Sequence, residues 1–279
     1  MDPFQVYTLA NSILLGIAAY NVVELCLTIY HTFERRQGLY FASIVISTLA
    51  LAIFILGSSL LLPDSRLFVS VGRYIYFFAW PVLGTSHIVL LYSRLHLVLH
   101  SRRILRGILI MIIISSTVIV PPQLIVPYIG YSGGFSDVRL ARKVWRCVQG
   151  VVVVNTMARE VIISGVYAVQ AYRYLRPIVQ VKGEKGRGVM VYLIIVHIAV
   201  VLIDIPYVVM FFSHHGVAID GYTGLMYSIK LKMELAVLNM LVTLLKSPVV
   251  LGGIEGSDEG SEGGELNLNI QELSSRARE

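Results

Sequence analysis

The chain has 279 residues, of which 56% are hydrophobic and 14% are charged, and its formal net charge is +6. A mean hydropathy of +0.73 is too high for a water-soluble domain. The apolar residues come in unbroken blocks, which favours helices in lipid over a soluble core or an outer-membrane barrel. The positive charge suits contact with anionic membrane lipids and gives no reason to expect nucleic-acid binding.

Seven apolar blocks predict an all-α polytopic membrane protein, a bundle of seven transmembrane helices. Each block has about the 20 residues that an α-helix needs to cross a hydrocarbon core. The blocks cover residues 6–30, 39–62, 67–91, 107–129, 148–172, 189–212 and 225–245. The chain thus divides into a transmembrane domain, 1–246, and a tail, 247–279. The tail is rich in Gly, Ser and acidic residues, a composition that predicts a disordered cytosolic segment.

The distribution of Arg and Lys predicts the orientation of the bundle. Basic residues are more frequent in the connections after the first, third and fifth blocks than in the others, which predicts an external N-terminus and a cytosolic C-terminus. The connection 131–146 is basic on the side predicted to be external and argues against this orientation. Four arginines near the end of the third block are the predicted contact for a cytosolic protein partner: Arg94, Arg102, Arg103 and Arg106.

Charged side chains also occur inside the apolar blocks. A charge at membrane depth is costly unless it faces the protein interior or water. These residues are Glu24, Arg73, Arg159, Glu160, Asp204, Lys230, Lys232 and Glu234. Their acids and bases balance, which indicates either an ion-pair network between helices or a solvated cavity for a polar ligand.

Depth estimates suggest which of these charges pair. At about 1.5 Å per helical residue, Asp204 lies at the depth of Arg73 and of Lys230. Lys230 and Glu234 are four residues apart and are expected on one helix face. An outer cavity around Arg73, Asp204 and Lys230 is therefore the predicted ligand site.

Other polar and small residues suggest packing. His87 and His197 are single histidines on apolar faces and are interpreted as contacts between helices. Gly57 and Gly84, with neighbouring Ser and Thr residues, are expected where helices pack closely. No spacing of His, Cys and Glu resembles a metal site, and no cofactor is expected.

Four segments carry a resemblance to a known family. They are LYSRLHLV (91–98), RRILRGILIMII (102–113), REVIISGVY (159–167) and YSIKLKMELAV (227–237). They resemble the signature segments of a fungal family of seven-helix integral membrane proteins of unknown function, and the resemblance covers about 30–245. It implies seven helices and a fungal source but no activity. Likeness to G-protein-coupled receptors is architectural only, because no acid precedes Arg94 as in their Asp/Glu-Arg-Tyr motif.

These observations leave three functions open. The first is a receptor-like or sensor protein that binds a lipophilic small molecule in a polar cavity within the membrane. The second is a membrane-embedded biosynthetic enzyme, similar to terpene cyclases, with Glu160, Asp204 or Glu234 as the catalytic acid. The third is a transporter, and beside these three a purely structural or scaffold role is also left open. In each case the chain is a multi-pass protein among membrane lipids, in the plasma membrane or an endomembrane.

Overall fold

The computed structural model describes residues 3–33, 38–63, 65–98, 101–131, 138–213 and 219–246. These residues form six helices: α1 (Pro3–Thr32), α2 (Leu39–Leu60), α3 (Arg66–Val98), α4 (Arg102–Tyr131), α5 (Val138–Phe212) and α6 (Ile219–Lys246). The described part of the chain contains no strand, so the all-α prediction is confirmed. The predicted tail, 247–279, lies outside the described residues.

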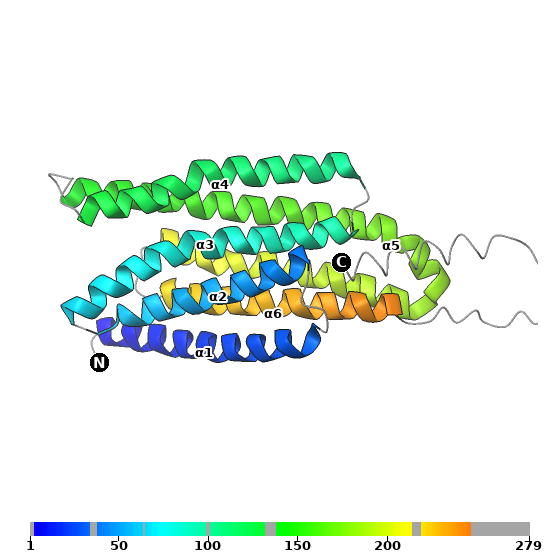
Figure 1. Cartoon of the computed structure of the whole chain (residues 1–279), viewed down its shortest axis with the longest axis horizontal. Helices are drawn as coiled ribbons and strands as arrows, with labels where there is room; N and C mark the ends of the chain where they lie inside the picture. Colours follow the sequence, from blue (N-terminus) through cyan, green and yellow to red (C-terminus); the bar gives the residue numbers. More distant parts are fainter. Residues whose placement is uncertain are drawn as a thin grey trace, which may run out of the picture.

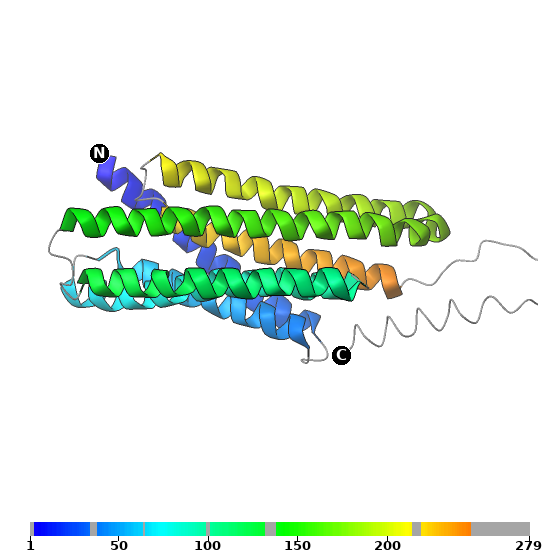
Figure 2. The ribbon, with the colours of Figure 1, turned by 90° about the horizontal axis from the view of Figure 1, so that it is seen from above.

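Helix α5 contains the fifth and sixth predicted blocks and doubles back on itself. The ring of Tyr167 stacks on that of His197 with centroids 4.3 Å apart, and Gly150 faces Phe211. These contacts pair early and late positions of α5 in antiparallel order, and the reversal is visible at one end of the bundle (Figures 1 and 2). Thus α5 supplies two antiparallel arms, here called its first and second arms.

Six helical segments are long and apolar enough to cross a membrane. They are Gln5–Thr32, Leu39–Leu60, Arg66–His96, Arg102–Ile129, Lys143–Gln170 and Ile194–Phe212. These segments make the chain a multi-pass membrane protein by length and composition. Helix α6 has a comparable length, but Lys230, Lys232 and Glu234 interrupt its apolar run. It packs against α1, α2 and α5, which shield it from the surroundings of the bundle (Figure 1).

The distribution of side chains fits a bundle surrounded by lipid. Large apolar side chains are exposed on the outer faces, for example Val23 and Leu27 on α1 and Ile110, Ile114 and Val118 on α4. The interior, in contrast, contains most of the charged side chains discussed below. An apolar exterior around a charged interior reverses the pattern of a soluble protein and is the arrangement that a bilayer favours.

Glycines allow α2 and α3 to approach closely. A Cβ atom added to Gly72 would lie 2.6 Å from Leu60 Cβ, and one added to Gly57 would lie 2.8 Å from the Tyr76 backbone nitrogen. The packing role predicted for Gly57 is therefore confirmed. The same prediction is wrong for Gly84, because a Cβ atom there would meet nothing within 4 Å. Gly84 instead lines a cavity.

The helices define two ends of the bundle. Helix α1 begins at one end, where α2 also ends, α3 begins and α6 begins; this is called the N-terminal end (Figure 1). Helix α6 ends at the opposite, C-terminal end. The predicted grouping of the connections into two sets agrees with this arrangement.

Candidate functional site

One face of α6 carries most of the interior polar groups. Asp220, Tyr227, Lys230 and Glu234 follow one another at intervals of seven, three and four residues, so they lie along one side of the helix. All but Asp220 are at most 3% exposed. This polar face of α6 meets partners on α3 and on both arms of α5.

The central cluster consists of Lys230, Glu160, Asp204 and His87. The Lys230 Nζ atom donates hydrogen bonds to Glu160 Oε2 at 2.6 Å and to Asp204 Oδ1 at 2.5 Å. The Nε2 atom of His87 lies 3.4 Å from Glu160 Oε1. The cluster therefore brings together buried polar and charged side chains from α3, both arms of α5 and α6.

The observed ion pairs agree only in part with the pairs predicted from residue depth. Asp204 pairs with Lys230, one of the two partners predicted for it, and the charges close on each other. Glu234 pairs with Arg94 of α3, not with Lys230 as predicted from their spacing. A buried pair that loses one partner leaves an uncompensated charge, so removal of one member of these pairs is expected to destabilise the bundle.

Arg94 corrects one sequence-based prediction. Its side chain was expected at the cytosolic surface, but it is only 4% exposed and forms an ion pair with Glu234. Its guanidinium also lies over the Tyr167 ring, 5.4 Å from the centroid. Arg102, Arg103 and Arg106, at the start of α4, are exposed, and their contact with a protein partner stays a prediction.

A third pair lies toward the periphery, between α1 and α6. Lys232 Nζ donates to Glu24 Oε2 at 2.5 Å and to Asn21 Oδ1 at 2.6 Å. Their side chains are 30% (Lys232) and 50% (Glu24) exposed. This ion pair connects α6 to α1 and is separate from the central cluster and from the Arg94–Glu234 pair.

A pocket of about 430 Å³ lies at the N-terminal end of the bundle and is called the end pocket. Its lining is aromatic with two opposite charges: Leu61, Val69, Arg73, Tyr76, Phe77, Trp80, Trp145, Gln149, Tyr207, Phe211, Ile219, Asp220 and Thr223. The Tyr76 hydroxyl donates to Asp220 Oδ1 at 2.9 Å, which fixes one carboxylate oxygen at the wall. Small-molecule pockets typically enclose about 300–1,000 Å³, so the end pocket has the size of a ligand site.

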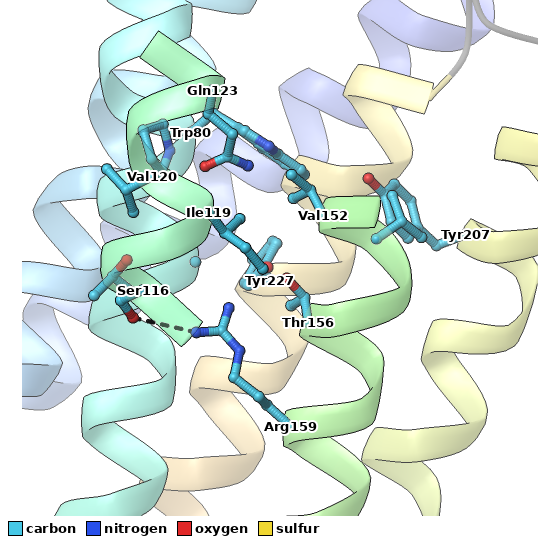
Figure 3. Close-up of a pocket in the computed structure, with 14 residues that line it drawn as sticks. Trp80, Ser116, Ile119, Val120, Gln123, Val152, Thr156, Arg159, Tyr207 and Tyr227 are labelled. Carbon is cyan, nitrogen blue, oxygen red and sulfur yellow. Dashed lines mark hydrogen bonds between the residues drawn. The ribbon is translucent and has the colours of Figure 1, made fainter. Parts of the chain in front are cut away.

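A smaller cavity of about 30 Å³ lies next to the end pocket and is called the Arg159 cavity. Its walls come from α3, α4, both arms of α5 and α6 (Figure 3). Arg159 Nη1 donates to Ser115 Oγ and to Ser116 Oγ of α4, each at 3.3 Å. Trp80 and Tyr207 line both spaces, so the two are adjacent.

Comparison with known proteins assigns the chain to a protein family. The family described as Domain of unknown function (DUF7703) matches residues 4–250. The chain belongs to this family. Membership in DUF7703 agrees with a family of unknown function as implied by the sequence resemblance, while a fungal source stays a prediction. No curated protein and no solved structure matches the chain.

The structure brings together some predicted site residues and separates others. Glu160, Asp204 and Lys230 form one cluster, whereas Arg73 lines the end pocket and does not join them. The sequence pattern does not reveal Asp220, because the last apolar block begins at residue 225 whereas α6 begins at Ile219. The signal in the sequence for the end pocket was the group of aromatic residues inside the third block, just before the fifth block and near the end of the sixth.

Proposed function

We propose that the protein is a receptor-like membrane sensor that binds a small amphipathic molecule in the end pocket. The observation that carries this proposal is the pocket itself, about 430 Å³ of space with six aromatic side chains, Arg73 and Asp220 in its walls. Aromatic faces bind apolar groups and cations, and the two charges orient a polar group. This composition suits a ligand with an apolar body and a charged or zwitterionic group.

The central cluster couples ligand binding in the end pocket to the packing of the other helices. Tyr207 lines the end pocket and lies three residues from Asp204 on the second arm of α5. A ligand that displaces Tyr207 therefore shifts Asp204 relative to Lys230, whose partners lie on different helices. Packed interfaces tend to switch between discrete arrangements, so a small shift at a pocket becomes a change in helix packing.

The proposed topology places the N-terminus outside and the C-terminus in the cytosol, with α6 as the seventh crossing. The basic connections support this orientation. The end pocket then opens outward, and the exposed Arg102, Arg103 and Arg106 face the cytosol, where they are suited to an acidic partner. A fungal cell and either the plasma membrane or an endomembrane are part of this proposal.

The geometry favours binding over acid catalysis. A catalytic acid must touch its substrate, but Glu160 and Asp204 bind Lys230 and Glu234 binds Arg94. Among the lining residues of the two cavities, none of these three acids appears. The proposal of an enzyme similar to terpene cyclases therefore lacks an accessible acid at the predicted positions.

Tryptophan fluorescence tests the proposal directly. The chain has two tryptophans, Trp80 and Trp145, and both line the end pocket. Purified protein in lipid nanodiscs is titrated with amphiphiles that share one alkyl chain and carry an ammonium, a carboxylate, a zwitterionic or an uncharged group. We expect saturable quenching or a spectral shift with at least one charged amphiphile.

Two variants and a control assign the site. Asp220→Asn is expected to weaken an ammonium ligand and Arg73→Gln a carboxylate ligand, each by about tenfold or more, because a hydrogen bond to a charge contributes about 1.5–3 kcal/mol. Arg173→Gln, on an exposed part of α5, serves as the control. No saturable response to any amphiphile, or equal binding by all variants, would contradict the proposal.

A further inference from the structure

We infer that the Arg159 cavity is a binding site for a carboxylate group. The inference goes beyond the proposed sensor function and does not require the end pocket to hold a ligand. It rests on three observations: a buried guanidinium with no ion-pair partner in the described part of the chain, a cavity in front of it, and the donors that line that cavity.

Arg159 is buried and forms no ion pair with any residue that the structure describes. The residue is 6% exposed, and its guanidinium binds only the hydroxyls of Ser115 and Ser116 among the described residues. Its Nε atom is buried and has no hydrogen-bond partner. An arginine stays charged in a protein, so this position carries a positive charge that forms no ion pair among the described residues and is offset only in part by the nearby Glu160. The acid next to it in sequence, Glu160, binds Lys230 on another helix and does not fill the role.

The space beside Arg159 fits a small anionic group. The cavity volume is about 30 Å³, whereas a single water molecule needs only about 10–15 Å³ of such space, so a compact group of a few atoms fits and a bulky one does not. Gly84 contributes to this space, since a Cβ atom at that position would meet nothing within 4 Å. The cavity is therefore partly a product of the missing side chain on α3.

The polar groups around the cavity can all donate hydrogen bonds. They belong to Trp80, Thr85, Ser116, Gln123, Thr156, Arg159, Tyr207 and Tyr227, and no described carboxylate lines the cavity. In Figure 3 the Arg159 side chain extends toward Ser116, with Thr156 and Tyr227 nearby. A guanidinium binds a carboxylate through two parallel hydrogen bonds, and a low-polarity surrounding strengthens them. A carboxylate would neutralise Arg159 and use these donors.

The carboxylate has two possible sources, a free small acid or the head of an amphiphile. Ile119, Val120, Val152 and Val153 supply apolar walls, and the end pocket adjoins the cavity through Trp80 and Tyr207. A short alkyl chain therefore has apolar surface to contact beyond the head. Acetate and decanoate distinguish the two sources, because only decanoate has such a chain.

The experiment uses the full chain in nanodiscs with Trp145→Phe, so that fluorescence reports on Trp80, which lines the cavity. Thermal unfolding and Trp80 emission are measured with acetate, decanoate and decanol, the last matched in length but uncharged. A response to decanoate and not to decanol is expected. A response to acetate as well would identify a free carboxylate as sufficient. No response to either carboxylate, or equal responses to decanoate and decanol, would overturn the inference.

Two variants locate the response. Arg159→Gln is expected to weaken decanoate binding by about tenfold or more, given the strength of hydrogen bonds to a charged group. Gly84→Leu should weaken it similarly by filling the cavity while leaving Arg159 in place, which guards against a folding defect in the first variant. Arg173→Gln should behave as the parent. If decanoate binding is lost in Arg73→Gln and kept in both cavity variants, the site is the end pocket and the inference is wrong.

Discussion

At the residue scale, Lys230 is the side chain on which the interior depends most. It is 1% exposed and bonds to two carboxylates that come from the two arms of α5. Breaking a buried ion pair by removing one partner costs about 3–5 kcal/mol, because the remaining charge stays buried without compensation. Replacing all members by apolar or neutral groups of similar size is often close to neutral.

This difference predicts the result of a substitution series. Lys230→Met should lower the melting temperature of the purified protein strongly, with a loss of about 3 kcal/mol or more. Adding Glu160→Gln and Asp204→Asn to that variant should recover most of the loss, because no charge is then left unpaired. Arg106→Gln, at the exposed start of α4, is the control and should change stability little. A triple variant as unstable as Lys230→Met would show that packing, not charge, is the cause.

At the element scale, the contact between α2 and α3 depends on two glycines. Gly57 and Gly72 face the partner helix at distances that leave no room for a side chain, whereas a Cβ atom on Gly165 of α5 would meet nothing within 4 Å. Glycine itself disfavours a helix by about 1 kcal/mol relative to alanine. The two kinds of position should therefore respond in opposite directions to the same substitution.

Alanine substitutions test this contrast. Gly72→Ala should destabilise the protein by about 1–3 kcal/mol, because the added methyl group overpacks the α2–α3 contact. Gly165→Ala should be neutral or stabilising by up to about 1 kcal/mol. Thermal unfolding in one detergent compares the two variants with the parent. Equal effects would mean that α2 and α3 separate readily to accept a side chain.

Sequence reasoning found the elements more easily than their partners. Each apolar block falls on a helix, because length and hydropathy identify a membrane-spanning segment without knowledge of its neighbours. Pairing depends on the rotation of each helix about its axis, which the blocks do not specify. The estimated depth of each residue in the membrane therefore allows Asp204 to pair with either Arg73 or Lys230. The same estimate identifies no partner for Arg94. Arg94 was misassigned to the surface because α3 continues to Val98, beyond the predicted end at residue 91.

At the scale of the whole molecule, the proposed orientation determines the side of the membrane to which the end pocket opens. An N-glycosylation acceptor sequence on a short N-terminal extension is expected to be modified, whereas the same extension on the C-terminus should stay unmodified. The physical reason is the excess of basic residues at the C-terminal end of the bundle, which favours retention in the cytosol. Glycosylation of the C-terminal extension alone would show that the orientation is the opposite one, with the end pocket on the cytosolic side.

The charges of α6 also constrain how the protein is made. A lysine near the middle of a helix opposes insertion into a bilayer by about 2.5–3.5 kcal/mol, and α6 has two, Lys230 and Lys232, followed by Glu234. The interior partners of α6, including Arg94, Glu160 and Asp204, all precede it in the chain and so emerge earlier from the ribosome. Integration of α6 by the translocon should therefore require prior assembly of α3 with α5, and a nascent chain without these helices should leave α6 outside the membrane.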